Sequence, residues 1–142
     1  MADDLTAEQR RYNMSRIRST NSKPEEIVRK YLFARGFRYR KNVRGLPGCP
    51  DIVLRKYHTV IFVNGCFWHK HDCPRFHWPS SNVEYWRKKI TGNVERDHRN
   101  TALLESKGWH VITVWECELK KAVVEERLSR LCQEIQENIL HD

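Results

Sequence analysis

The segment at residues 64–81 limits most strongly what this chain can fold into. It contains Gly65, Pro74, Pro79 and several aromatic side chains, with neither a helical nor a strand-like repeat. It also contains the run Cys66-Phe67-Trp68-His69-Lys70-His71-Asp72-Cys73, in which cysteines and histidines follow one another closely. We therefore expect a loop that something other than a hydrophobic core must order.

A metal ion is the organiser that this composition favours. Four nitrogen and sulfur donors suit tetrahedral zinc, and Cys117 follows a predicted strand that can run beside the loop. We expect Cys66, His71, Cys73 and Cys117 to be the ligands. Four protein ligands leave no open position for a substrate, so the zinc would be structural and His69 would remain free for chemistry. The alternative, buried thiols beside solvated histidines, leaves the loop without an organiser.

The cysteine count and the first residues bear on the compartment. Met1-Ala2-Asp3-Asp4 lacks the layout of a secretory signal, so we expect a chain that stays in the reducing cytoplasm. Five cysteines cannot all pair, which also disfavours a disulfide framework. No apolar run approaches the roughly 20 residues that span a bilayer, so no membrane partner is expected.

The charge balance favours a polyanionic partner. Lysine and arginine total 26 against 18 acidic residues, for a net charge of +8, and basic residues are concentrated early in the chain. Nucleic acid is the expected partner, although such a balance can also serve solubility alone. A length of 142 residues suits one domain. We expect a flexible basic arm at residues 1–21 and a single domain at 22–142.

Periodicity predicts an α/β order of elements. Ser22-Lys23-Pro24-Glu25 has the form of a capping box that starts a helix, which Gly36 ends. Two β-branched runs, separated by a tight turn at 55–58, suit antiparallel central strands. The expected elements are a helix up to Gly36, strands at 37–40, 51–54 and 59–63, two helices from 82 that are divided at Gly92 and end at Gly108, a strand at 111–115, and an amphipathic helix at 123–139.

Several motifs together resemble the very short patch repair endonucleases. The core of the resemblance is Gly48-x-Pro50-Asp51 followed by Val60-Ile61-Phe62-Val63-Asn64-Gly65-Cys66-Phe67-Trp68-His69. Further matches are Asn13-Met14, Glu25, Trp86, Asn93-Val94-Glu95-Arg96-Asp97, Gly108-Trp109 and Val114-Trp115-Glu116-Cys117, so the resemblance covers residues 10 to 120. It implies a restriction-endonuclease-like fold, with a central mixed sheet flanked by helices, in an enzyme that nicks DNA 5′ to the thymine of T·G mismatches left by deaminated 5-methylcytosine.

The resemblance also implies roles for individual residues. Asp51 and the backbone carbonyl of Val63 would bind magnesium, and His69 would be the catalytic base or its orienter. Glu25 and Asp97 would support this site, and the four zinc ligands chosen by chemistry match the family's zinc positions. The side chains that would enter the base stack are Phe67, Trp68 and Trp86 from the major groove and Met14 from the minor groove.

Two departures from the family pattern concern the catalytic strand. The best-known members carry a histidine where this chain has Asn64, and asparagine donates a hydrogen bond but cannot shuttle a proton. We expect Asn64 to act through hydrogen bonding. The carboxylate-x-lysine signature of the wider nuclease fold is also missing, because Val63-Asn64-Gly65 stands in its place.

Simpler explanations exist for four of these residues. Asp51 follows Pro50 and would otherwise be read as a turn residue, but a buried strand and a free histidine nearby favour a metal anchor. Asp97 can hold the His69 imidazole in one tautomer or be a surface charge. Glu25 is explained by capping alone, and the helical spacing of Trp86 also suits a core residue.

The same residues also suit two other functions. One is a zinc-stabilised DNA-binding protein in which Asp51 and His69 are incidental, and the other is a restriction-type nuclease that cuts both strands. The resemblance further suggests a monomer with functional links to mismatch-repair proteins and to a cytosine-5 methyltransferase.

Overall fold

A four-stranded mixed sheet organises the residues that this computed structural model describes, 23–74 and 76–139. Its strands, in spatial order, are β1 (Arg40–Lys41), β2 (Ile52–Leu54), β3 (Thr59–Asn64) and β4 (His110–Trp115). β2 is antiparallel to β1 and β3, as the tight turn between β2 and β3 requires, whereas β3 and β4 are parallel. A parallel pair needs a long crossover, and here α3 (Val83–Ser106) and the loop before it supply one.

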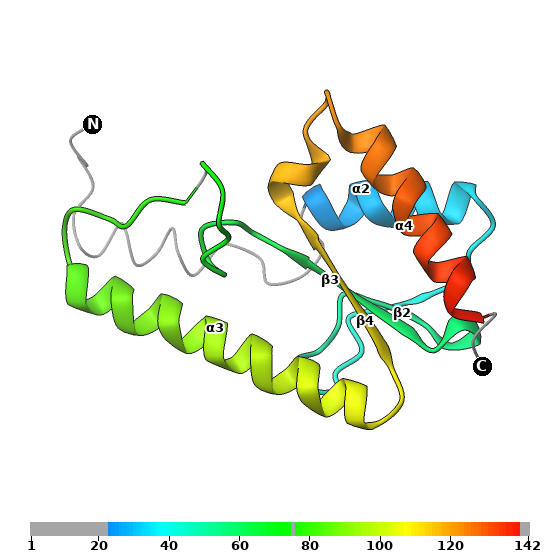
Figure 1. The fold of residues 1–142 in the computed structure, drawn as a ribbon, viewed down its shortest axis with the longest axis horizontal. Helices are drawn as coiled ribbons and strands as arrows, with labels where there is room; N and C mark the ends of the chain where they lie inside the picture. Colours follow the sequence, from blue (N-terminus) through cyan, green and yellow to red (C-terminus); the bar gives the residue numbers. More distant parts are fainter. Residues whose placement is uncertain (1–22, 75, 140–142) are drawn as a thin grey trace.

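Helices cover both faces of this sheet (Figure 1). α2 (Lys23–Ala34) and α4 (Val124–Ile139) lie together on one side, and the carboxyl-terminal half of α3 lies on the other. Two short 3-10 turns, η1 (Arg55–Tyr57) and η2 (Glu116–Leu119), follow β2 and β4. The expected α/β architecture, a mixed sheet flanked by helices, is therefore confirmed.

Strand alternation divides the buried side chains into two clusters. Ile52, Ile61 and Ile112 point toward α2 and α4, where they join Leu32 and Leu131 in the larger cluster. Their neighbours Val53 and Val60 point the other way and meet Leu104 of α3, with Trp109 packed against them. The sheet is thus buried on both faces, as its near-continuous apolar strands predict.

The expected division of residues 82–108 into two helices at Gly92 is wrong, because α3 runs without interruption from Val83 to Ser106. A single interior glycine costs a helix only about 1 kcal/mol relative to alanine, and the helix-forming residues on both sides outweigh that cost. Only Ile90 and Leu104 are buried in this helix. Its amino-terminal half extends beyond the sheet, and Ile90 is the residue buried in that half (Figure 1).

The strand expected at 37–40 is shorter than the alternation suggested and begins only at Arg40. Gly36 adopts a left-handed conformation, with φ of 89°, and the Phe37 N–H donates to the Leu32 carbonyl at 3.0 Å. Phe37 is then buried in the larger cluster. The residues after α2 complete its carboxyl-terminal cap instead of extending the sheet.

Some expectations fall on residues outside the described part of the chain. These are the basic arm at 1–21, Met14 within it, and Ser22 of the capping box. Among the described residues, no helix combines the length and the apolar composition that crossing a membrane requires.

We expect Gly92→Ala to stabilise the protein by about 0.5–1 kcal/mol, because alanine restricts the unfolded chain and favours the helix. No atom outside the helix's own backbone lies within 4 Å of the position of the new Cβ. Gly48→Ala is the contrasting variant, since Gly48 has φ of 77° and a Cβ there would lie 3.0 Å from the Asn100 Nδ2 atom. Urea unfolding should show opposite shifts of the midpoint, and a lower midpoint for Gly92→Ala would contradict the prediction.

Candidate active site and metal centre

One end of the sheet gathers most of the candidate residues. Asp51 precedes β2, Val63 and Asn64 end β3, and Cys117 lies two residues after β4. Because β2 runs against β3 while β4 runs with it, the start of β2 and the ends of the other two strands meet at the same edge. The topology alone therefore brings these distant segments together.

A pocket of about 300 Å³ opens at this edge. Six of the residues singled out in the sequence line it, namely Glu25, Asp51, Val63, Asn64, His69 and Asp97. Glu25 comes from the first turn of α2 and Asp97 from the middle of α3, so elements on both faces of the sheet contribute.

Asp51 is held firmly in this pocket and is costly to ionise. Its Oδ2 atom accepts a hydrogen bond of 2.7 Å from the Val63 N–H. Burial raises the pKa of the Asp51 carboxyl to about 7, against the lowering effect of that hydrogen bond, and the neighbouring Glu25 carboxyl raises the pKa further. Glu25 is itself only 2 % exposed and pairs with Arg29 at 3.2 Å. A half-buried carboxyl, that of Asp51, thus interacts with a buried one, that of Glu25.

Such a carboxyl pair suits a hard divalent cation. Carboxylate oxygens are the ligands that magnesium prefers, and a cation between them would offset both the burial cost and the mutual repulsion. Val63, from which a carbonyl ligand is expected, lines the same pocket and fixes Asp51 through its N–H. The donor set present here therefore fits a magnesium ion.

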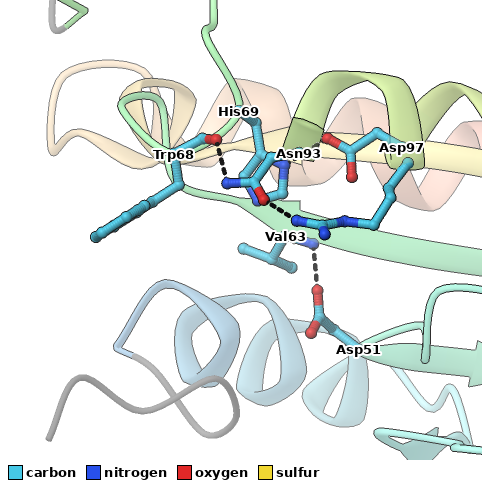
Figure 2. Close-up of polar contacts among 7 residues, drawn as sticks. Asp51, Val63, Trp68, His69, Asn93 and Asp97 are labelled. Atoms are coloured by element: carbon cyan, nitrogen blue, oxygen red, sulfur yellow. Dashed lines mark hydrogen bonds and ion pairs between the residues drawn. The ribbon is translucent and has the colours of Figure 1, made fainter. Parts of the chain in front are cut away.

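His69 lies beside this pair and is oriented by Asp97. The His69 Nδ1 atom is 2.5 Å from the Asp97 Oδ2 atom (Figure 2). A carboxylate accepts a hydrogen bond from an Nδ1–H group and so favours the tautomer in which Nε2 is the basic nitrogen of the neutral ring. The pairing considered from sequence is therefore present, and Asp97 is more than a surface charge.

Four other side chains form a separate cluster beyond the ends of β3 and β4. The ligand atoms of Cys66, His71, Cys73 and Cys117 all lie within 4.8 Å of one another, and the Cys117 Sγ atom is 3.4 Å from the His71 Nδ1 atom. Tetrahedral zinc with bonds of about 2.3 Å to sulfur needs ligand atoms roughly 3.8 Å apart. The expected ligand set is thus assembled as a possible metal site, and His69 is not part of it.

The chemistry of the thiols also fits a soft metal. Burial raises the pKa of the Cys66 thiol to about 12 and raises the pKa of Cys117 as well. Unligated, these thiols would stay neutral near pH 7, whereas coordination to zinc stabilises the thiolate form. Trp115 stacks on the imidazole of His71, with ring centroids 4.0 Å apart and planes 10° apart, and so fixes the plane of that ligand.

Three of the side chains expected to enter the base stack lie in the described part of the chain, and these wedge residues form one aromatic group. Phe67 lies 5.3 Å from Trp68 and 5.5 Å from Trp86 between ring centroids, and the two tryptophans are 5.7 Å apart. All three side chains are half-buried. Trp86 is in neither hydrophobic cluster, which disfavours the alternative that it is a core residue.

Sequence reasoning gave no role to three residues that shape this region. Asn93 donates from Nδ2 to the Trp68 carbonyl at 3.0 Å, Asn100 lies against Gly48 in the pocket wall, and Trp115 stacks on His71. The i, i+4 spacing of Asn93 and Asp97 was a usable signal, because it places both side chains on one face of a helix. The stack of Trp115 had no local signal, since it depends on the pairing of β3 with β4.

Comparison with known proteins gives one consistent result. A family model described as DNA mismatch endonuclease Vsr matches residues 2–75. The type II nicking enzyme V.NmeAIP of Neisseria meningitidis is 52 % identical over 140 residues, which cover 98 % of this chain and 100 % of that protein. The DNA mismatch endonuclease Vsr of Escherichia coli is 38 % identical over 136 residues, which cover 94 % of this chain and 87 % of that protein.

We expect Cys117→Ser to lower both the bound metal and the melting temperature, because the cluster ties the loop after β3 to the turn after β4. Metal content by mass spectrometry and thermal unfolding would test this. Cys132→Ala is the control, since Cys132 lies on α4 and is buried in the larger hydrophobic cluster, so its loss should leave the metal content unchanged. Full metal content and an unchanged melting point in Cys117→Ser would exclude that ligand.

We also expect Asp51→Asn to stabilise the protein in the absence of added magnesium. The folded-state pKa of the Asp51 carboxyl, about 7, lies above its ordinary value of 3.8. The stabilisation that comes from the protonated carboxyl is therefore complete below pH 3.8 and is lost as the pH rises through 7. The variant's gain in melting temperature should therefore grow between about pH 4 and pH 7 and then stay constant. Glu26→Gln, which removes an exposed carboxyl, should show no such trend. A gain that shrinks with rising pH would contradict the burial argument.

Proposed function

Because the chain belongs to the Vsr family of DNA mismatch endonucleases, we propose that it nicks one strand of duplex DNA, with magnesium, 5′ to the thymine of a T·G mismatch. It is a DNA mismatch endonuclease, and the proposal concerns its substrate, its cations and the residues that act. We also propose that residues 22–142 form a single endonuclease domain.

The observation that carries the proposal is the common pocket of Asp51, Glu25 and His69. Hydrolysis of a phosphodiester needs a polarised phosphoryl oxygen, an activated water and a stabilised leaving oxygen. Magnesium, when bound, supplies charge stabilisation for the phosphoryl and leaving oxygens. Asp51 is the anchor for that cation, with Glu25 and the Val63 carbonyl as supporting donors.

His69 acts as the general base. Its Nδ1 is committed to Asp97, so Nε2 is left to take a proton from the attacking water. Histidine suits this step because its ordinary pKa is about 6.5, near the working pH. Asn64 lines the same pocket and serves by donating a hydrogen bond to the scissile phosphate, which requires no proton shuttle.

The aromatic group supplies a means of selecting mismatched DNA. Phe67, Trp68 and Trp86 present three rings at one site, and inserting a side chain into a base step costs least where pairing is already weak. A T·G pair is such a step. Met14 is the expected partner from the other groove and lies outside the described residues.

The exposed half of α3 provides the electrostatic contact with the duplex. Arg87, Lys88 and Lys89 are exposed on its first turns, and Arg96 and Arg99 follow. Each phosphate that such side chains neutralise steepens the fall of affinity with salt by roughly 0.9 in log K per log salt. The zinc cluster acts by bracing the loop that carries Trp68 and His69, and takes no part in the chemistry.

We expect Asp51→Ala to lower nicking of a T·G duplex by about 10³-fold or more, because the cation loses its anchor. Binding of the same duplex in calcium should persist. Nicking is measured on end-labelled duplexes with magnesium, and Glu26→Ala, an exposed neighbour of Glu25, is the control that should keep full activity.

The same assay separates the other two functions. Equal cutting of both strands of a fully paired duplex would indicate a restriction-type nuclease. Binding of mismatched DNA without any magnesium-dependent nick would indicate a non-catalytic DNA-binding protein. Unchanged nicking by Asp51→Ala would remove this carboxylate from the mechanism.

A further inference from the structure

The wedge residue Trp68 and the proposed general base His69 are adjacent in the chain, and side chains of α3 bind both. Asn93 donates from Nδ2 to the Trp68 carbonyl at 3.0 Å, and Asp97 binds the His69 imidazole at 2.5 Å (Figure 2). Asn93 and Asp97 are four residues apart on α3 and therefore share a face of the helix. Two consecutive loop residues are thus attached to two consecutive turns of the same helix.

The Asn93 amide is held in one orientation. Its Oδ1 atom accepts a hydrogen bond from Arg96 Nη2, which leaves Nδ2 to donate to the Trp68 carbonyl. A rotated amide would place its oxygen against that carbonyl oxygen and its NH₂ group against the guanidinium. Both ends of the side chain are therefore satisfied in only one of its two orientations.

The loop between the two anchors is too tight to move in parts. The His69 N–H donates to the Gly65 carbonyl at 3.3 Å, the Lys70 N–H to the Phe67 carbonyl at 3.3 Å, and the His71 N–H to the Cys66 carbonyl at 2.9 Å. Cys66 and His71 also belong to the metal cluster. A displacement of Trp68 must therefore carry His69 with it.

The side chains of Trp68 and His69 lie at different sites. In Figure 2 the Trp68 ring points away from Asp51 and Asp97, whereas the imidazole of His69 reaches Asp97. The Trp68 ring belongs to the aromatic group, and His69 lines the pocket. The peptide bond between Trp68 and His69 is consequently the shortest connection between the aromatic group and the pocket.

We propose that Asn93 is a positioning residue that couples insertion of the aromatic wedge to the alignment of His69. By holding the Trp68 carbonyl on the face of α3 that also holds the imidazole, Asn93 keeps His69 in register when the neighbouring ring enters the base stack. Without this anchor the Trp68 ring still enters the base stack. Its insertion then displaces His69 and strains the hydrogen bond between His69 and Asp97. The inference rests on the proposed function.

Asn93→Asp isolates the anchor, because aspartate keeps the size and the contact with Arg96 but has no N–H to offer the Trp68 carbonyl. Asn93→Ala is the second variant, in case the new charge disturbs folding, and Glu95→Gln, on the exposed side of the same turn, is the control. The substrate is a duplex with one T·G pair and a 2-aminopurine in the adjoining base step. The purine fluoresces when that step is unstacked.

With enzyme in excess over DNA, we expect both Asn93 variants to cleave about 10- to 100-fold more slowly at saturation, the range that a small misplacement of a reacting group produces. The fluorescence rise on binding in calcium and the melting temperature should match those of the parent. Parent-like cleavage at saturation would overturn the proposal. So would a loss confined to binding, since it would mean that Asn93 contacts the DNA directly.

A second measurement on the protein without DNA keeps this test separate from the test of the nicking activity. Amide hydrogen exchange at His69 and Lys70 should be faster in Asn93→Asp than in the parent or in Glu95→Gln, because the loop has lost a fixed point. Unchanged exchange would refute the anchor whatever the parent does to DNA. A parent that fails to nick T·G duplexes, together with faster exchange in the variant, would refute the proposed function and leave the anchor standing.

Discussion

The parallel pairing of β3 with β4 is the constraint on which the rest of this site depends. It places Asn64 opposite Trp115, so that the chain leaves both strands at the same level. Two residues further along, Cys66 and Cys117 meet in the cluster that could hold a metal, and the cluster also brings Cys73 to Cys66 across the loop between them. His69 lies in this loop. Its imidazole lines the same pocket as Asp51, which precedes β2, the antiparallel neighbour of β3.

Sequence reasoning succeeded where the chemistry of a residue type limits the choices. Cysteine and histidine in a loop without helical or strand periodicity pointed to the four clustered ligands, and β-branched runs pointed to β2, β3 and β4. It was wrong at Gly92 and at residues 37–40, where a weak local preference was overridden by the helix on either side and by the burial of Phe37. Asn93 and Trp115 received no role, because their partners lie on other elements of the fold.

The arrangement proposed for catalysis in the pocket works against folding. Placing Asp51 and Glu25 together in a desolvated corner works against the stability of the unligated protein, as the raised pKa of Asp51 records. The same pair would bind a divalent cation more tightly than carboxylates exposed to solvent would. The two hydrophobic cores offset that cost, and the cluster of Cys66, His71, Cys73 and Cys117 shares no residue with the pocket.

The common level at which β3 and β4 end has a consequence for insertions and deletions. One residue added between Asn64 and Cys66, or between Trp115 and Cys117, would displace one cysteine from the cluster, because both cysteines now lie two residues beyond a paired strand end. Residues 79–82, by contrast, form neither helix nor strand and connect the loop to α3, after Phe76 has packed against Phe67. Variation in chain length among proteins of this kind should therefore accumulate in that connection, while the spacing at the strand ends stays constant.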